Sequence, residues 1–299
     1  MKICDYVLLT SADNTYNGRH FTPGLNTSNT CDIFIYSRNS VHKHIYCNKN
    51  VMTYIWSVML PDTHHIYHDR GTDRVITDSI IIYNRISIWD DPILCNKAVD
   101  VQNNLLAYVK IQNDSMCKKA IDNNYQLIAH VHFQTEWLCK RAVNIDWRAL
   151  EFIRHPSHTV QMIAVKQSWK ALKFIQKQSY ILCIEAIKQH PDALGLIIKQ
   201  TEDICMRAIK YHPQSFAHVR DQTLMLCKEA IFRHHYMLDF VRNQTPELCK
   251  FAIDQSWRAI MFVRNKNIDI CLYAIEKNKQ ALQYIDDDIK KYIRLVEQC

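Results

Sequence analysis

Small and apolar residues recur every 22 positions from Asp91 to the end of the chain. Alanine fills one position of this repeat nine times in succession, from Ala98 to Ala274, and valine or isoleucine always follows it. The position three residues before the alanine is cysteine in every repeat but one, where Gln161 replaces it: Cys95, Cys117, Cys139, Cys183, Cys205, Cys227, Cys249 and Cys271. An apolar residue precedes each of these positions, which completes the stripe of an amphipathic helix. A fixed period of this size is typical of arrays whose units bury their faces by stacking.

Residues that favour helix N-termini flank this stripe and predict two helices in each repeat. Four residues before the cysteine position stand only N-capping residues: Asp91, Asn113, Thr135, Ser157, Ser179, Thr201, Thr223, Thr245 and Asn267. A second capping position follows seven residues after the cysteine position: Gln102, Asn124, Asp146, Ser168, His190, His212, His234, Ser256 and Asn278. The second helix is expected to bury residues such as Leu150, Phe152 and Ile153. Each repeat is therefore predicted as a helix, a tight turn and a helix.

The first 90 residues lack this period and predict a different fold. Their apolar runs at 33–36, 54–60 and 75–88 favour strands, 41–46 favours a short helix, and 14–30 favours a loop. We predict a mainly α protein, with a small α+β domain over 1–90 and an α-solenoid over 91–299. The solenoid is expected to hold nine repeats, with a capping helix over 289–299 closing its last apolar face.

Two parts of the sequence resemble a known group of proteins. The recurring motif Ala-(Ile/Val)-x5-(Ala/Leu)-(Leu/Ile)-x-(Phe/Tyr)-(Ile/Val), as in Ala252-Ile253 to Phe262-Val263, resembles helical repeats of unknown function found in giant viruses of amoebae. The first domain, with Tyr16-Asn17-Gly18 and Arg74 to Ile82, looks like the leading domain of mimivirus-type repeat proteins, including ankyrin-repeat ones. This resemblance implies a viral, intracellular interaction-repeat protein, and it brings no catalytic residues.

Composition narrows the class of protein. Apolar residues make up 48% of the chain, and 4 Gly and 7 Pro argue against a disordered or turn-rich protein. An uncharged apolar run of about 18 residues and a signal-peptide core are both missing, so we expect an intracellular protein without a membrane span. The 12 cysteines favour reduced core thiols, with disulfide or metal use as the alternative.

Motifs for chemistry are sparse. The clusters His64-His65 with His68, and His42 with His44 and Cys47, lack the second half-site of a zinc motif. Glycine-rich phosphate loops and the common hydrolase and metalloprotease motifs do not occur. We therefore expect no metal, no cofactor and no enzymatic activity.

One polar edge is a candidate binding site. Basic residues recur one turn beyond the second-helix core, at Lys110, His132, Arg154, Arg220, Arg242 and Arg264. Glutamines recur two residues later, at Gln112, Gln134, Gln178, Gln200, Gln222 and Gln244. The edge either complements helix C-termini or binds phosphates or an acidic peptide. The whole net charge of +7 lies in the chain from Asp91 onward, because basic and acidic residues balance up to Asp90.

Two functions remain. The leading hypothesis is a non-enzymatic scaffold that binds a protein partner, so far unidentified, through the repeat surface. The alternative is single-stranded RNA binding along the basic edge, with bases stacked on Trp147, Trp169 and Trp257, which share one repeat position.

Overall fold

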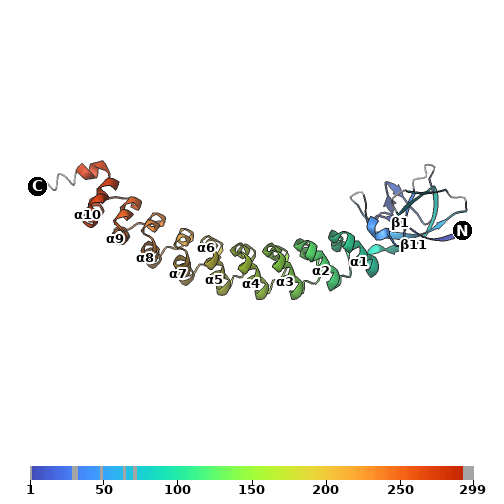
Figure 1. Ribbon diagram of the computed structural model, residues 1–299, viewed down its shortest axis with the longest axis horizontal. Coiled ribbons are helices and arrows are strands. Elements are labelled where there is room, and N and C mark those ends of the chain that lie inside the picture. Colours follow the sequence, from blue (N-terminus) through green and yellow to red (C-terminus); the bar gives the residue numbers. More distant parts are fainter. Residues whose placement is uncertain (1, 29–32, 48–49, 63–64, 70–72, 292–299) are drawn as a thin grey trace. The chain divides into compact units, whose positions relative to one another are not determined.

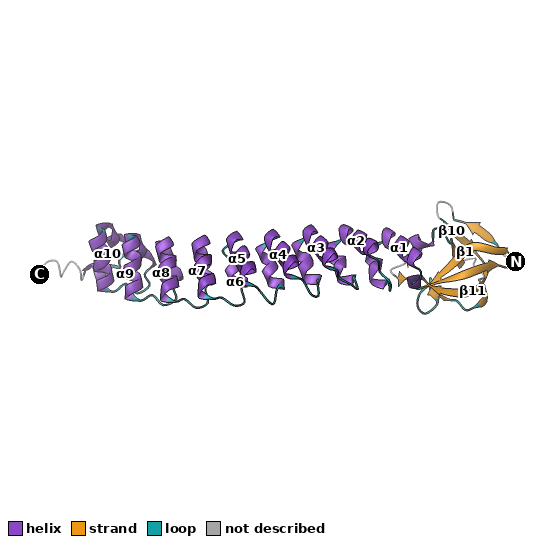
Figure 2. Cartoon of the chain, turned by 90° about the horizontal axis from the view of Figure 1, so that it is seen from below, coloured by secondary structure: helices purple, strands orange, loops and turns teal. Residues whose placement is uncertain are grey.

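The computed structural model describes residues 2–28, 33–47, 50–62, 65–69 and 73–291. The chain divides into two compact units, one comprising 1–145 with 152–154 and the other 146–151 with 155–299. Strands occur up to Ser87 and helices predominate from Pro92, as Figures 1 and 2 show. The protein is therefore mainly α with an N-terminal β domain. The change from strands to helices falls between Ser87 and Pro92.

The β domain contains an antiparallel sheet of order β4-β11-β8-β1-β5-β10-β9. Its strands are β1 (Lys2–Thr10), β4 (Gly24–Thr27), β5 (Ile33–Ser37), β8 (Tyr54–Leu60), β9 (Ile66–His68), β10 (Arg74–Thr77) and β11 (Ser79–Ser87). Two-stranded antiparallel sheets are formed by β2 (Thr15–Tyr16) with β3 (Arg19–His20), and by β6 (Tyr46–Cys47) with β7 (Asn50–Val51). The predicted strands at 33–36 and 54–60 are confirmed as β5 and β8.

Two other predictions for this domain need correction. The single strand expected over 75–88 is two strands, β10 and β11, separated at Asp78. The loop expected over 14–30 contains β2, β3 and β4. Asn17 and Gly18 take the positive φ angles of 49° and 76° that the tight turn between β2 and β3 requires, and β4 forms because it pairs with β11. The short helix expected over 41–46 is confirmed as the 3-10 helix η1 (Val41–His44), which ends two residues earlier.

The end of the β domain packs against the first helices within the first unit. The 3-10 helix η2 (Ile88–Asp90) buries Ile88 and Trp89. The Trp89 ring stacks on Tyr108 with their centroids 5.6 Å apart, and the Cys95 thiol donates to the Ile88 carbonyl at 3.4 Å. The apolar face of the first repeat is therefore covered by residues that precede it.

The predicted first helices are α-helices of ten residues each. Their bounds are α1 (Pro92–Val101), α2 (Asp114–Asn123), α3 (Glu136–Ile145), α4 (His158–Gln167), α5 (Tyr180–Gln189), α7 (Glu202–Tyr211), α8 (Leu224–Arg233), α9 (Pro246–Gln255) and α10 (Ile268–Lys277). All nine predicted N-caps are confirmed, since each capping side chain accepts a hydrogen bond from a backbone N–H of the first turn.

The second helices are shorter, and nearly all are 3-10 helices. They are η3 (Asn103–Tyr108), η4 (Tyr125–His130), η5 (Trp147–Phe152), η6 (Trp169–Phe174), α6 (Ala193–Leu196), η7 (Pro213–His218), η8 (His235–Phe240), η9 (Trp257–Phe262) and η10 (Lys279–Tyr284). Their predicted caps are confirmed at Asn124, Asp146, Ser168, His190 and Asn278. The prediction was wrong at Gln102, His212, His234 and Ser256, whose side chains form no capping bond.

The core follows the repeat. Each alanine of the alanine column is fully buried, and the eight described cysteines of the repeat are at most 3% exposed. The predicted second-helix face is wrong in one position: Phe240 is 44% exposed and Phe152 is half-buried, whereas the small residue Ala149 is buried. A six-residue 3-10 helix turns three residues per turn, which brings a different set of side chains to the core.

Glutamine side chains hold neighbouring repeats together. The Gln200 amide nitrogen donates to Leu194 O at 2.9 Å in its own repeat and to His218 O at 3.1 Å in the next. Its oxygen accepts a hydrogen bond from the Arg220 backbone N–H at 3.0 Å. Gln112, Gln134, Gln178 and Gln244 form the same three bonds. We call this arrangement the glutamine clip.

The predicted C-terminal capping helix lies mostly outside the described residues. Residues 287–291 are helical, and Lys290 N donates to Asp286 O at 3.1 Å. Positions 292–299 are not described.

One buried hydroxyl should weaken the fold. Ser215 is fully buried and its Oγ has no hydrogen-bond partner among the described residues, whereas the same position is alanine in five other repeats, including Ala171. We expect Ser215→Ala to raise the free energy of unfolding by about 1–3 kcal/mol, because it removes an unsatisfied polar group. Urea denaturation measures this change, and the reverse substitution Ala171→Ser should lower it. A Ser215→Ala protein no more stable than the wild type would contradict the expectation.

Candidate functional site

The arginines of the predicted basic edge bind backbone carbonyls of the preceding repeat. Arg220 donates from Nη1 to Ile198 O at 2.7 Å and from Nη2 to Ile197 O at 2.9 Å. Arg154 and Arg242 repeat this arrangement on the two carbonyls 22 and 23 residues earlier. Arg264 binds the carbonyls of Arg242 and Asp239. A guanidinium has five N–H donors, so each arginine keeps donors for a further acceptor.

The six predicted edge residues form two separate groups. Lys110, His132 and Arg154 belong to the first unit, and Arg220, Arg242 and Arg264 to the second. Gln176 and Ile198 occupy the edge position in the two repeats between the groups. Lys110 forms an exposed ion pair with Asp90 at 2.8 Å, and the His132 N–H binds the Gln112 clip at 2.9 Å. In the second group, Arg220 and Arg242 line a shallow cavity of about 390 Å³.

The tryptophans proposed to stack bases contact side chains of the protein. The ring centroid of Trp147 lies 6.0 Å from that of Phe174, and the ring centroid of Trp257 lies 6.1 Å from that of Tyr284. In both pairs the second residue belongs to the next repeat. Trp169 stacks on His190 with centroids 4.9 Å apart. These contacts favour packing within the protein over stacking on bases.

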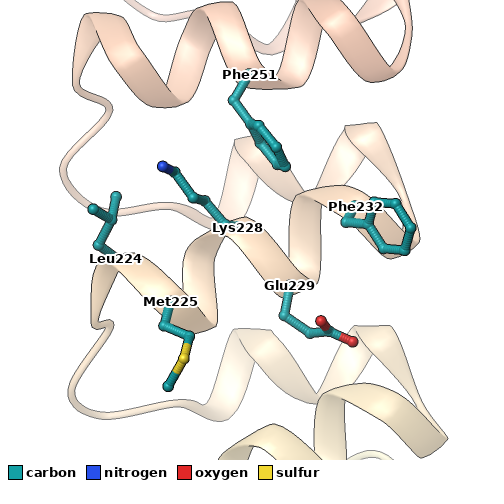
Figure 3. Close-up of a pocket in the computed structure, with 6 residues that line it drawn as sticks. All are labelled: Leu224, Met225, Lys228, Glu229, Phe232 and Phe251. Carbon is teal, nitrogen blue, oxygen red and sulfur yellow. The ribbon is translucent and has the colours of Figure 1, made fainter.

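An apolar surface on α8 and α9 was missed by the sequence analysis. Figure 3 shows it around a cavity of about 530 Å³, with Phe251 projecting from α9 towards α8. It is lined by Leu224, Met225, Lys228, Glu229, Phe232 and Phe251. Phe232 is 62% exposed and Met225 is 55% exposed, so large apolar side chains face solvent here. We call this surface the α8–α9 patch.

Charged residues surround the α8–α9 patch and are already paired. Lys228 forms an ion pair with Glu247 at 2.6 Å, and Glu229 forms one with Arg233 at 3.0 Å. The Lys228 ammonium also lies 5.8 Å from the centre of the Phe251 ring. The patch is therefore apolar at its centre and polar at its rim.

The two phenylalanines replace an ion pair that other repeats form. We call the residue five positions after the cysteine position the outer position. It lies opposite a residue of the next repeat, the one two positions after that repeat's cysteine position. Asp100 binds Lys119 across this gap at 3.0 Å, and Asp122 binds Arg141. Phe232 and Phe251 stand at the corresponding positions of α8 and α9. A comparison of these two columns in the sequence could have found the patch, because only one pair in them is doubly aromatic.

The thiols of the cysteine position are buried, and one described histidine of the predicted clusters is paired with a carboxylate. Burial raises the pKa of Cys95, Cys117 and Cys205 to about 11 by penalising the thiolate, and it raises the pKa of the other five thiols of the column. In the predicted histidine cluster, His65 binds Asp78 at 2.5 Å, and this hydrogen bond lowers the pKa of Asp78 to about 2. His64 lies outside the described residues. Groups of three metal-binding side chains are absent from the described parts of the chain.

Comparisons add no relative for this chain. Family models, curated proteins and solved structures yield no match to it. The resemblance to giant-virus repeat proteins therefore stays a prediction. Within the described ranges, every helix is too short or too polar to cross a membrane.

The buried thiols should make stability depend on alkaline pH. The folded pKa of Cys95, Cys117 and Cys205 is raised from about 9 to about 11, so their burial stabilises the fold below pH 9 and this contribution is lost as the pH rises to about 11. We expect the stability difference between the wild type and the Cys95→Ala/Cys117→Ala/Cys205→Ala variant to decrease over this window. Urea denaturation in reductant at pH 7, 9 and 10.5 measures it. A difference that stays constant with pH would show that the thiols are solvated.

The basic edge can be tested by replacing Arg154, Arg220, Arg242 and Arg264 with glutamine. Because all four guanidinium groups bind helix-end carbonyls, we expect a loss of a few tenths of a kcal/mol of unfolding free energy per site. Any weak binding of single-stranded RNA should stay unchanged. If the edge instead binds phosphates, the slope of log affinity against log salt should flatten by about 0.7 per lost contact. Fluorescence anisotropy with a labelled oligouridine distinguishes these results.

Proposed function

We propose that the helical part of the chain is an α-solenoid of 22-residue repeats that acts as a non-enzymatic scaffold. Two observations support the solenoid. Neighbouring first helices contact each other within each unit, as α7 contacts α8 and α8 contacts α9. The glutamine clip also links successive repeats in one constant register. Stacked repeats of this kind present an extended face for binding.

The α8–α9 patch carries the proposal that this scaffold binds a protein. An apolar surface with a polar rim is typical of protein contact sites, in which aromatic anchors contribute most of the binding free energy. Phe232, Phe251 and Met225 provide such anchors, and the paired charges at the rim leave the centre free of uncompensated charge. The resemblance of the sequence to interaction-repeat proteins is consistent with this function.

Single-stranded RNA binding along the basic edge is the second candidate. The observation that favours it is the cavity of about 390 Å³ beside Arg220 and Arg242, whose guanidinium groups keep free donors. Two observations weigh against it: the edge is interrupted at Gln176 and Ile198, and the tryptophans pack within the fold.

The patch can be removed by restoring the ion pair of the other repeats. Phe232→Asp with Phe251→Lys copies the Asp100 and Lys119 pair, so we expect the unfolding free energy to change by no more than about 1 kcal/mol. Binding of the protein partner should be lost. Affinity purification from cells that produce the protein, followed by quantitative mass spectrometry, measures the partner's retention.

The matched control is Phe240→Asp, which changes a 44% exposed phenylalanine outside the patch. Partner retention by the wild type and by this control, but not by the double variant, supports the proposal. Equal retention by all three proteins contradicts it.

A further inference from the structure

Three lysines occupy the outer position in the repeats that lead to the α8–α9 patch. They are Lys166, Lys188 and Lys210, in the last turns of α4, α5 and α7. Phe232 holds this position in the next helix, α8. All three lysines are exposed, and none takes part in an ion pair within the described part of the chain. We call these residues the lysine row.

Helix capping does not require the lysine row. A cation in the last turn of a helix is favoured by the helix dipole, which would be a sufficient reason for a single lysine. Aspartate nevertheless fills the same position in α1, α2 and α9, where Asp100, Asp122 and Asp254 each form an ion pair with the next helix. The outer position therefore does not need a cation.

The residues opposite the lysine row form no ion pair with it among the described residues. Arg207 stands opposite Lys188 and binds Asp203 in its own helix at 3.1 Å. Glu229 stands opposite Lys210 but binds Arg233 at 3.0 Å. Glu185 stands opposite Lys166 without forming an ion pair to it. The three ammonium groups of the row therefore form no ion pair among the described residues, and the nearby charge of Lys210 only helps to lower the pKa of Asp203.

The lysine row and the α8–α9 patch adjoin each other. Helices α4 and α5, α5 and α7, α7 and α8, and α8 and α9 are in contact as neighbours. Glu229, which stands opposite Lys210, also lines the patch cavity. The surface thus combines an apolar cavity with a line of positive charge that leads away from it in steps of one repeat.

From this arrangement we propose that the surface binds an extended acidic peptide with an apolar end. The apolar side chain would occupy the α8–α9 patch, and carboxylates would pair with Lys210, Lys188 and Lys166 in turn. Neighbouring helices lie about 8–10 Å apart, and an extended chain rises about 3.3 Å per residue, so the acidic residues would recur about every third position. This inference rests on the proposed function and names the chemistry of its partner.

A designed peptide tests the inference directly. The probe is a fluorescein-labelled peptide of about 12 residues with Phe-Leu at one end and Asp at every third position after it, separated by Ser and Gly. We expect it to bind the full chain saturably in fluorescence anisotropy. The same peptide with Lys in place of Asp, or with Ser-Ser in place of Phe-Leu, should bind at least about tenfold more weakly.

The protein variants separate the two parts of the site. Lys166→Gln/Lys188→Gln/Lys210→Gln should weaken binding of the acidic peptide about tenfold, or about twofold for each exposed ion pair, and should reduce its salt dependence. The matched control Lys177→Gln/Lys199→Gln/Lys279→Gln removes the same charge from exposed positions outside the row and should bind as the wild type does. Phe232→Asp with Phe251→Lys should abolish binding.

Three results would overturn the inference. Absence of saturable peptide binding is one, and if partner retention still depends on Phe232 and Phe251, the proposed function survives this failure. An equal loss of affinity in both lysine triple variants is the second, because it would indicate only the overall charge. Tighter binding of a labelled oligouridine than of the acidic peptide, lost in the lysine-row variant, is the third, since it would assign the row to nucleic acid.

Discussion

The glutamine clip is the interaction on which the helical part of the chain depends. The first and second helices are too short to be stable alone, so their order must come from neighbours. One amide in each clipped repeat satisfies two carbonyl groups and one N–H group at helix ends that would otherwise need water. Because two of these three bonds reach the next repeat, forming a second helix and docking its neighbour become the same event. Apolar burial drives the stacking, and the clip sets its register.

Much of this architecture could be predicted because the same residue types recur at the same positions of each repeat. A capping residue at one position proves little, but nine capping residues in one column define a helix start, and all nine caps form. The form of the second helix could not be predicted, since Leu150, Phe152 and Ile153 suit an α-helical face as well as a 3-10 helix. The β domain occurs once, so its hairpin at Asn17 and Gly18 had no second copy to reveal it.

For the candidate binding surfaces, recurrence along the sequence was a poor guide. The basic edge was predicted as a site because its residues recur. A structural role also produces recurrence, and Arg220 and Arg242 bind backbone carbonyls in the same way. The α8–α9 patch is an exception within its columns, so a search for regularity passed over it. In a protein made of copies, the residues that hold the copies together are repeated. Residues that bind another molecule need not be repeated.

The constant reach of the clip has a consequence for the history of such a chain. Gln200 bonds to carbonyls that lie 6 residues before it and 18 residues after it, and never farther. Loss or duplication of one 22-residue segment would therefore join two ends that already fit, since the new neighbour presents the same carbonyls at the same distances along the chain. The gene could change the length of its product in whole repeats and keep the clip bonds between them. Pro156 and Lys266, which stand where two clips would be, mark the junctions at which such an exchange would disturb the fewest bonds.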